Sequence, residues 1–202
     1  MTEPDAVLRF WEDEVGEKRW YVSESAVDDM IRDRFLKLWE DARLGRLRDW
    51  CATAKGALAA LVVTDQFPRN MFRGDARSFA TDPLARAIAR DALDHGFDRT
   101  VEGSIRQFFY MPFMHSEAAA DQELSVALMS DRMRDPEHVL HARAHREVIR
   151  RFGRFPFRNA ALGRETTGEE QVFLAGGAYP ALVREMREAM QSTHGSPSKP
   201  PS

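Results

Sequence analysis

The sequence predicts an all-α protein in which antiparallel helices stack on one another. Apolar residues recur at spacings of three and four in several long segments, as expected for helices with one buried face. Proline near the start and glycine near the end punctuate these segments, which is typical of helix termini. The alternating apolar runs of β-hairpins are missing. We therefore expect about eight helices joined by short turns.

The N-terminal half is expected to contain two long helices. An apolar stripe predicts the first over Ser25–Leu44, and Gly45 is expected to end it. Residues 53–66 are apolar on nearly all sides and predict a second, central helix. Pro68 disfavours helical geometry in the residue before it, so this helix is expected to end near Gln66.

Proline and glycine also delimit the middle helices. Asp82 is the expected N-cap of the next helix, with Pro83 at its first position and Gly96 after its end. A short helix is then expected to end before Pro112. The following helix is expected to start near Ser116, which would serve as its N-cap.

The C-terminal helices carry similar signals. Asp135 and Pro136 predict a helix start, and Gly153 predicts its end. Thr166 and Glu169 have the spacing of a capping box and open another helix. A last amphipathic segment follows. Residues 1–194 are therefore predicted to form a single all-helical domain, and residues 195–202 a disordered tail without apolar anchors.

Composition excludes several classes of protein. The 202 residues are 43% hydrophobic, enough for a substantial core, and the net charge of −3 gives no general attraction to nucleic acid or membranes. An arginine-rich run over residues 143–164 lacks a recognised nucleic-acid motif, so nucleic-acid binding is not expected. A lone cysteine, Cys51, and the absence of a membrane-spanning run indicate a cytoplasmic protein without a membrane partner.

Three clusters of polar residues lie in otherwise apolar surroundings. Two of them contain related phrases, DQFPRN at residues 65–70 and RFPFRN at residues 154–159, in which arginine and asparagine follow Phe-Pro. We expect all three clusters to line one polar cleft. The first cluster comprises Asp65, Gln66, Arg69, Asn70 and Arg73, the second Tyr110, His115, Glu117, Asp121 and Gln122, and the third His141, His145, Arg154, Arg158 and Asn159.

The charged residues of this cleft need partners of opposite charge, and two interpretations of the cleft follow. Arginines and carboxylates in apolar surroundings need partners, and pairing with one another would be sufficient. Alternatively, Arg69, Arg154 and Arg158 hold a small anionic ligand, a carboxylate or a phosphate, because guanidinium groups bind such anions in two-point fashion. In this second interpretation Asn70 and Asn159 orient the loops or the ligand.

The same residues allow other chemistry. Glu117 with His145 is the expected acid–base pair if the site is catalytic, and the sequence leaves open whether it is. His141 and His145 have metal-ligand spacing with Glu117 and Asp121 nearby, but no glutamate follows His141 as in zinc proteases, so neither metal nor cofactor is predicted. The alternative from another class is a helical adaptor that binds a protein or peptide partner on its concave face.

The motifs DQFPRN, RGDARSFATDPLA, FFYMPFMHSE and RFGRFPFRNAALGR together resemble the bacterial domain-of-unknown-function family number 924, from Val7 to Gly177. The resemblance implies an all-α, tetratricopeptide-like fold and no established activity. Members of that family usually have histidine where this chain has Phe157. The departure speaks against a mechanism that needs an imidazole at this position and transfers that expectation to His115 and His145.

Overall fold

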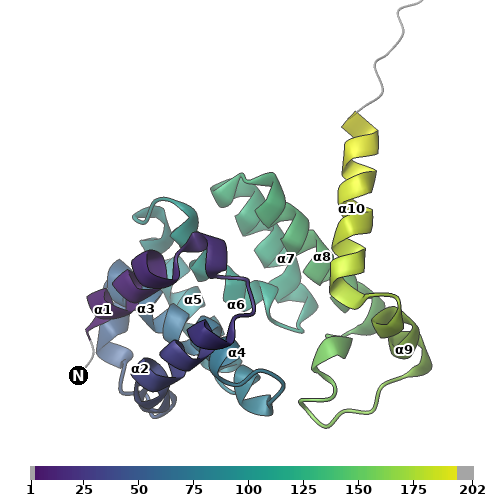
Figure 1. Cartoon of the computed structure of the whole chain (residues 1–202). Helices are drawn as coiled ribbons and strands as arrows, with labels where there is room; N and C mark the ends of the chain where they lie inside the picture. The colour runs from purple at the N-terminus through teal and green to yellow at the C-terminus, as the bar shows by residue number, and fades with distance from the viewer. Residues whose placement is uncertain (1–2, 195–202) are drawn as a thin grey trace, which may run out of the picture. The chain divides into compact units, whose positions relative to one another are not determined.

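Every regular element in residues 3–194, the part of the chain that the structure describes, is helical (Figure 1). This computed structural model therefore confirms the all-α class. The chain divides into two compact units, residues 1–116 and residues 117–202. The single domain over residues 1–194 stays a prediction, and the predicted disordered tail lies outside the described residues.

Over residues 3–116, the first unit contains six α-helices joined by π-helical and 3₁₀ turns. The prediction of a long helix after Ser25 is confirmed by α2. The α-helices are α1 (Pro4–Arg9), α2 (Ser25–Arg43), α3 (Ala54–Leu61), α4 (Phe67–Met71), α5 (Asp82–Asp94) and α6 (Met111–Met114). The π turns are Phe10–Val15 and Val62–Gln66, and the 3₁₀ turns are Glu17–Arg19, Arg48–Ala52, Ala76–Phe79, Phe97–Arg99 and Ser104–Phe109.

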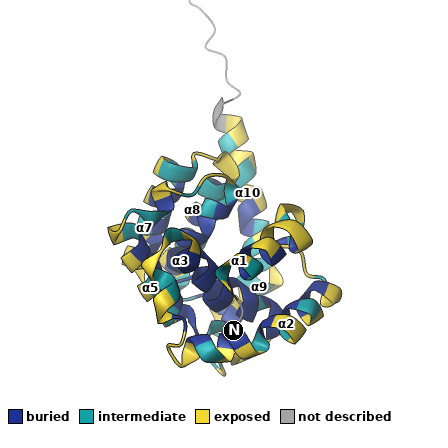
Figure 2. Ribbon diagram, turned by 90° about the vertical axis from the view of Figure 1, so that its left-hand side faces the viewer, coloured by how far each residue is buried: buried dark blue, intermediate teal, exposed yellow. Residues whose placement is uncertain are grey.

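Helix α3 is the centre of this unit, as its apolar sequence predicts (Figure 2). Both α1 and α5 pack against it, and α2 packs against α4. Gly56 allows the close approach at its start, because a Cβ there would lie 2.0 Å from the Trp50 carbonyl oxygen. Aromatic rings fill the space beside the helix in tilted and edge-to-face contacts. These rings belong to Phe10, Trp11, Phe35, Phe67 and Phe108.

The expected end of the central helix near Gln66 is wrong. The chain continues through the π turn Val62–Gln66 directly into α4, with Pro68 in its first turn. Pro68 has no N–H to donate to the Thr64 carbonyl, four residues earlier. Instead the Thr81 hydroxyl donates to this carbonyl at 2.6 Å, and Trp39 Nε1 donates to Thr81 Oγ1 at 3.1 Å. A partner from elsewhere in the sequence thus lets helical structure pass the proline.

The predictions at two other prolines, Pro112 and Pro83, also need correction. Pro112 lies in the first turn of α6 rather than after a helix. Thr81 is the N-cap of α5, so Asp82 and Pro83 are its first two residues. Proline is tolerated in a first turn because the N–H groups there have no intrahelical acceptor. The same prolines are therefore compatible with a helix that starts where an end was expected.

Over residues 117–194, the second unit contains four α-helices. Helix α8 packs against α7 and α10, and α10 also contacts α9. The apolar core consists of Leu140, Ala144, Val148, Ile149, Phe155, Leu182 and Val183. The helices are α7 (Ala119–Leu128), α8 (Pro136–Phe152), α9 (Gly168–Ala175) and α10 (Ala178–His194), with a π turn at Met129–Met133 and a 3₁₀ turn at Pro156–Arg158.

The helix ends in this unit follow the sequence signals with two shifts in register. Asp135 caps α8, and Gly153 ends it with a φ of 67°, as predicted. The capping box is formed by Thr167 and Glu170 rather than one residue earlier. Helix α7 begins at Ala119 rather than near Ser116. No helix in the described part of the chain is both long and apolar enough to cross a membrane.

The hydrogen bonds of Thr81 that let helical structure continue past Pro68 lead to a stability prediction. Thr81→Val keeps the shape of the side chain but leaves the Thr64 carbonyl and the Trp39 indole N–H without their buried partner. We expect the free energy of unfolding to fall by about 2 to 4 kcal/mol in urea denaturation. In the control, Thr100→Val, an exposed hydroxyl that bonds to the Phe97 carbonyl is lost, and water can replace it. Equal stability of the two variants would contradict the role of the Thr81 hydroxyl as the replacement for the missing Pro68 N–H.

Candidate functional site

Asp65 is the centre of the polar cluster in the first unit. It lies in the π turn before α4 and is 1% exposed. The His115 ring contacts both carboxylate oxygens through Nδ1, at 3.0 and 2.9 Å. Gln66 donates to the carboxylate at 2.5 Å, and Arg69 lies 3.3 Å from it. Arg69 also donates to Asp82, at 3.0 Å, so this guanidinium joins two acids.

The charge of Asp65 determines how His115 is held. Burial by itself raises the pKa of Asp65, but the nearby Arg69 and His115 outweigh burial and lower that pKa below its ordinary value. The carboxylate is therefore ionised and can only accept hydrogen bonds. Nδ1 of His115 must carry the hydrogen, and the negative charge beside the ring favours a positive charge on it.

Asn70 and Arg73 belong to a neighbouring cluster around Asp28 of α2. Arg73 donates to Asp28 through Nε at 2.5 Å and Nη2 at 2.9 Å, and Asn70 donates at 2.8 Å. Asp28 is 8% exposed. These bonds join α2 to the end of α4. Asn70 and Arg73, two of the predicted site residues after Phe-Pro, therefore stabilise a contact between helices. Arg69 is the one that lies beside Asp65.

Tyr110 does not present its hydroxyl to Asp65. The hydroxyl donates to the buried Asp98 at 2.8 Å. Sequence analysis missed Asp28, Asp82 and Asp98 as partners, because each lies in an ordinary helical or turn segment and only the fold brings it to an arginine, asparagine or tyrosine. Asp82 was identified only as a helix start.

In the second unit, Glu170 is the centre of the cluster around the second Phe-Pro phrase. Arg154 donates to it through Nε at 2.6 Å and Nη2 at 2.8 Å, and Asn159 donates at 3.1 Å. Hydrogen bonds from Arg154 lower the pKa of Glu170 against the effect of burial. An anionic ligand at Arg154 would therefore have to replace Glu170. The sequence signal for this residue was the acid-rich start of α9, which we read one position too early.

Glu117 is paired with Arg164 rather than with a residue of α7. Arg164 donates through both Nη atoms at 2.9 Å, and the Phe155 backbone N–H donates to the same carboxylate at 2.9 Å. Burial raises the pKa of Glu117, but these hydrogen bonds bring it below its ordinary value. Glu117 precedes α7, so the expected shared helix face with Asp121 is wrong. Its lowered pKa suits an ion pair better than a general acid.

The histidines of α8 lie among aromatic rings. His145 Nδ1 donates to the His141 carbonyl at 2.9 Å, and its ring packs against Phe155 and Tyr179. His141 Nδ1 lies 2.6 Å from the Tyr179 hydroxyl, and burial lowers the pKa of His141. Within the described residues, no group of three or more histidine, cysteine or acidic side chains could hold a metal ion. The Glu117–His145 acid–base pair stays a prediction.

Phe157 is 43% exposed and stacks on Phe155, while the Arg158 guanidinium lies 4.5 Å from the Phe155 ring centre. Asp121 and Gln122 are buried on α7, at 4% and 0% exposure. The predicted residues thus form local clusters in each unit. A single cleft shared by the three clusters stays a prediction.

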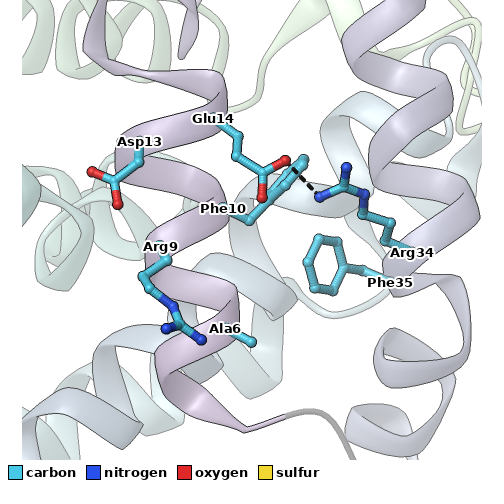
Figure 3. A pocket seen from close by; sticks show the side chains of 7 residues that line it. All are labelled: Ala6, Arg9, Phe10, Asp13, Glu14, Arg34 and Phe35. Carbon is cyan, nitrogen blue, oxygen red and sulfur yellow. Dashed lines mark hydrogen bonds and ion pairs between the residues drawn. The ribbon is translucent and has the colours of Figure 1, made fainter.

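A surface hollow of about 500 Å³ lies elsewhere, between the N-terminal helical segment and α2 (Figure 3). Figure 3 shows Glu14 and Arg34 pointing toward one another, and they are paired at 2.6 Å. Arg34 also lies 5.0 Å from the Phe10 ring centre. These contacts satisfy the central charges of the hollow internally, so it does not add to the polar clusters described above.

Comparison with known proteins agrees with the motifs. The sequence matches the family described as bacterial protein of unknown function, DUF924, over residues 7–178. The chain belongs to this family. A solved structure, that of the protein of unknown function ATU0120 from Agrobacterium tumefaciens, is 40% identical with a TM-score of 0.81. The match covers 85% of this chain and 96% of that chain, and no match was found among curated proteins. The similarity to this solved structure supports the helical fold.

The Asp65 cluster leads to a pH-dependent prediction. Asp65→Asn removes a buried charge and leaves His115 without its carboxylate, so the free energy of unfolding at pH 7 should fall by about 3 to 5 kcal/mol. The stability from this ionised group is complete above its ordinary pKa of 3.8 and is lost as the pH falls toward about 2. Urea denaturation of both proteins should therefore show a difference that narrows in acid.

The control for Asp65 is Asp75, whose side chain is 41% exposed and whose carboxylate is paired with its neighbour Arg77. Asp75→Asn should leave stability nearly unchanged, because exposed ion pairs contribute little. A constant difference between wild type and Asp65→Asn down to pH 2 would show that the charge of Asp65 is not what stabilises the fold.

Adjacent glutamates provide a matched test in the second unit. Glu170→Gln removes the carboxylate that holds Arg154 and closes the capping box, whereas Glu169 is exposed. We expect Glu170→Gln to lower the melting temperature by several degrees and Glu169→Gln to leave it nearly unchanged. The opposite order, measured by circular dichroism, would support the register expected from sequence.

Proposed function

We propose that the chain binds a small anionic metabolite, a carboxylate or a phosphate, at Arg69 and His115. The observation that carries the proposal is that both groups contact the same buried carboxylate, Asp65, from different elements. A histidine whose Nδ1 is held by an ionised carboxylate is oriented and is ready to carry positive charge. Buried titratable groups with perturbed pKa values are also enriched at functional sites.

Arg69 is the group best suited to contact a ligand. Its side chain is 20% exposed, so it is neither fully buried nor freely solvated. Its Nη atoms bond to Asp82 and to the backbone and side chain of Asp65, while Nε makes no hydrogen bond to any residue in the described range. Guanidinium donors that are already oriented bind anions at a smaller entropic cost. The π turn that carries Asp65 adds support, because such turns are frequent at functional sites.

The second unit supports the anion proposal less strongly. Arg154 and Arg164 each form two-point ion pairs with a glutamate. Arg158, at 7% exposure, packs on Phe155. Arg158 and Asn159 form the second region whose contact with the ligand is tested, through Arg158→Gln. The proposal further comprises a cytoplasmic location, which the lone Cys51 supports, and tetratricopeptide-like stacking of the helix pairs.

A helical adaptor is the alternative, and one observation favours it. Val172 on α9 is 74% exposed and lines an apolar hollow of about 490 Å³ with Phe152 and Phe173. Apolar surface of this kind is typical of protein-binding faces. In the adaptor interpretation the paired arginines are structural. Val172→Ser would then weaken partner binding without changing the response to small anions.

A thermal-shift screen with inorganic phosphate and a panel of di- and tricarboxylates tests the metabolite proposal. A ligand at about one hundred times its Kd stabilises the folded state by about 2.7 kcal/mol, which should raise the melting temperature by several degrees. Arg69→Gln should lose most of the shift relative to its own ligand-free melting temperature. Arg77→Gln, which changes an exposed arginine, should retain it.

Two further results would contradict the proposal in different ways. Equal shifts in wild type and Arg69→Gln would mean that this guanidinium does not contact the anion. Loss of the shift in Arg158→Gln, with retention in Arg69→Gln, would place the binding residues in the second unit instead.

A further inference from the structure

A groove of about 580 Å³ in the first unit has no part in the proposed anion site. It lies between the end of α2, the 3₁₀ turn Arg48–Ala52 and α5. Its volume falls within the range of ordinary small-molecule sites, about 300 to 1,000 Å³. Thr64, at its floor, precedes Asp65 but turns its hydroxyl to the Ala60 carbonyl. The groove therefore offers a separate surface.

The walls of the groove are mainly aliphatic. Leu44 lines it and is 66% exposed, so its side chain is accessible to a ligand. Leu84 and Ile88 are four residues apart on α5 and are only partly buried, while Leu47 is buried beneath. A chain of methylene groups along these side chains would remove apolar surface from water on both sides.

The polar groups of the groove differ in whether they are already engaged. Asp91 contacts His95, and burial together with the nearby Asp91 raises the pKa of Cys51, so the thiol stays neutral. The Arg48 side chain is exposed and lines the groove, and its guanidinium forms no hydrogen bond or ion pair with any residue that the structure describes. Its guanidinium is thus the charged group best placed to receive a ligand anion beside the aliphatic walls.

We propose that this groove binds a medium-chain aliphatic carboxylate, with the carboxylate on Arg48 and the chain along Leu44, Leu84 and Ile88. Charge selects the orientation, because a carboxylate satisfies Arg48 whereas an amine would meet it with like charge. Chain length supplies affinity through burial of methylene groups. A shorter carboxylate, such as butyrate, leaves most of the walls uncovered.

Cys51 provides a direct test, because it is the only cysteine of the chain and it lines the groove. N-ethylmaleimide labels it, and mass spectrometry of the intact protein measures the rate. Decanoate should slow labelling in a saturable manner, and octanoate should require a higher concentration, by about two- to four-fold for each methylene group that is removed. Decylamine and butyrate should not protect at the same concentrations.

Two variants test the contacts. Arg48→Gln should weaken protection by decanoate about ten-fold, as expected for loss of a hydrogen bond to a charged group. Leu44→Glu places a negative charge on an exposed wall position, so it should weaken protection without unfolding the chain. Arg99→Gln is the control, because it changes an exposed arginine outside the groove and should leave protection unchanged.

The outcomes separate this inference from the anion site at Arg69. Protection that survives in Arg69→Gln but is lost in Arg48→Gln supports the groove. Equal protection by decylamine and decanoate would overturn the role of Arg48, and absence of protection by decanoate in the millimolar range would overturn the site. If decanoate protected Cys51 only at concentrations that reduce the helical circular dichroism signal, the effect would be denaturation. This result would also overturn the site.

Discussion

Buried carboxylates held by arginine and asparagine are the interaction on which the polar interior of this protein depends. Asp28, Asp65 and Glu170 are each less than one-tenth exposed, and each accepts hydrogen bonds from at least two side chains. A carboxylate in such surroundings is costly unless its charge and its oxygen lone pairs are matched. Because the partners come from different helices, each cluster also specifies how two elements pack.

The two Phe-Pro phrases serve this interaction in the same way. In each, the proline lies in the first turn of a short helical element, and the asparagine that follows donates to a buried acid on another helix. An arginine near the phrase supplies two parallel hydrogen bonds to that acid, Arg73 to Asp28 and Arg154 to Glu170. The repeated phrase is thus explained by packing, and the ion-pairing interpretation accounts for most of its arginines.

Asp65 differs from the other two carboxylates in its partners. It holds an imidazole as well as a guanidinium, and it lies in a π turn that a proline follows. Structural ion pairs do not need a histidine, and the bypass of Pro68 requires its own buried hydroxyl, Thr81. The concentration of unusual backbone and titratable groups at this point is the reason for placing a ligand there rather than at Arg154.

The sequence by itself determined the all-α class, the long helix α2, the central α3 and the caps at Asp135 and Gly153, because apolar periodicity and capping chemistry act over a few residues. It also identified Arg69, Arg154 and Arg158 and the buried Asp65 and Asp121, but it missed the other buried carboxylates. It failed at Pro68, at Pro112 and at the register of the α9 capping box. At the two prolines, local signals are compatible with either the end or the start of a helix. At the capping box, either of two adjacent glutamates could close the cap.

Only the tertiary structure decided which charge meets which. Asp28, Asp82 and Arg164 carry no signal that distinguishes them from solvated residues, since pairing is a property of distance in space. The same holds for the Thr81 hydroxyl, which donates to a carbonyl seventeen positions away in place of the missing Pro68 N–H. The propensity to form a helix depends on residues that are close in the sequence. The hydrogen-bond partners of a buried charge, in contrast, come from elements that meet only when the core forms.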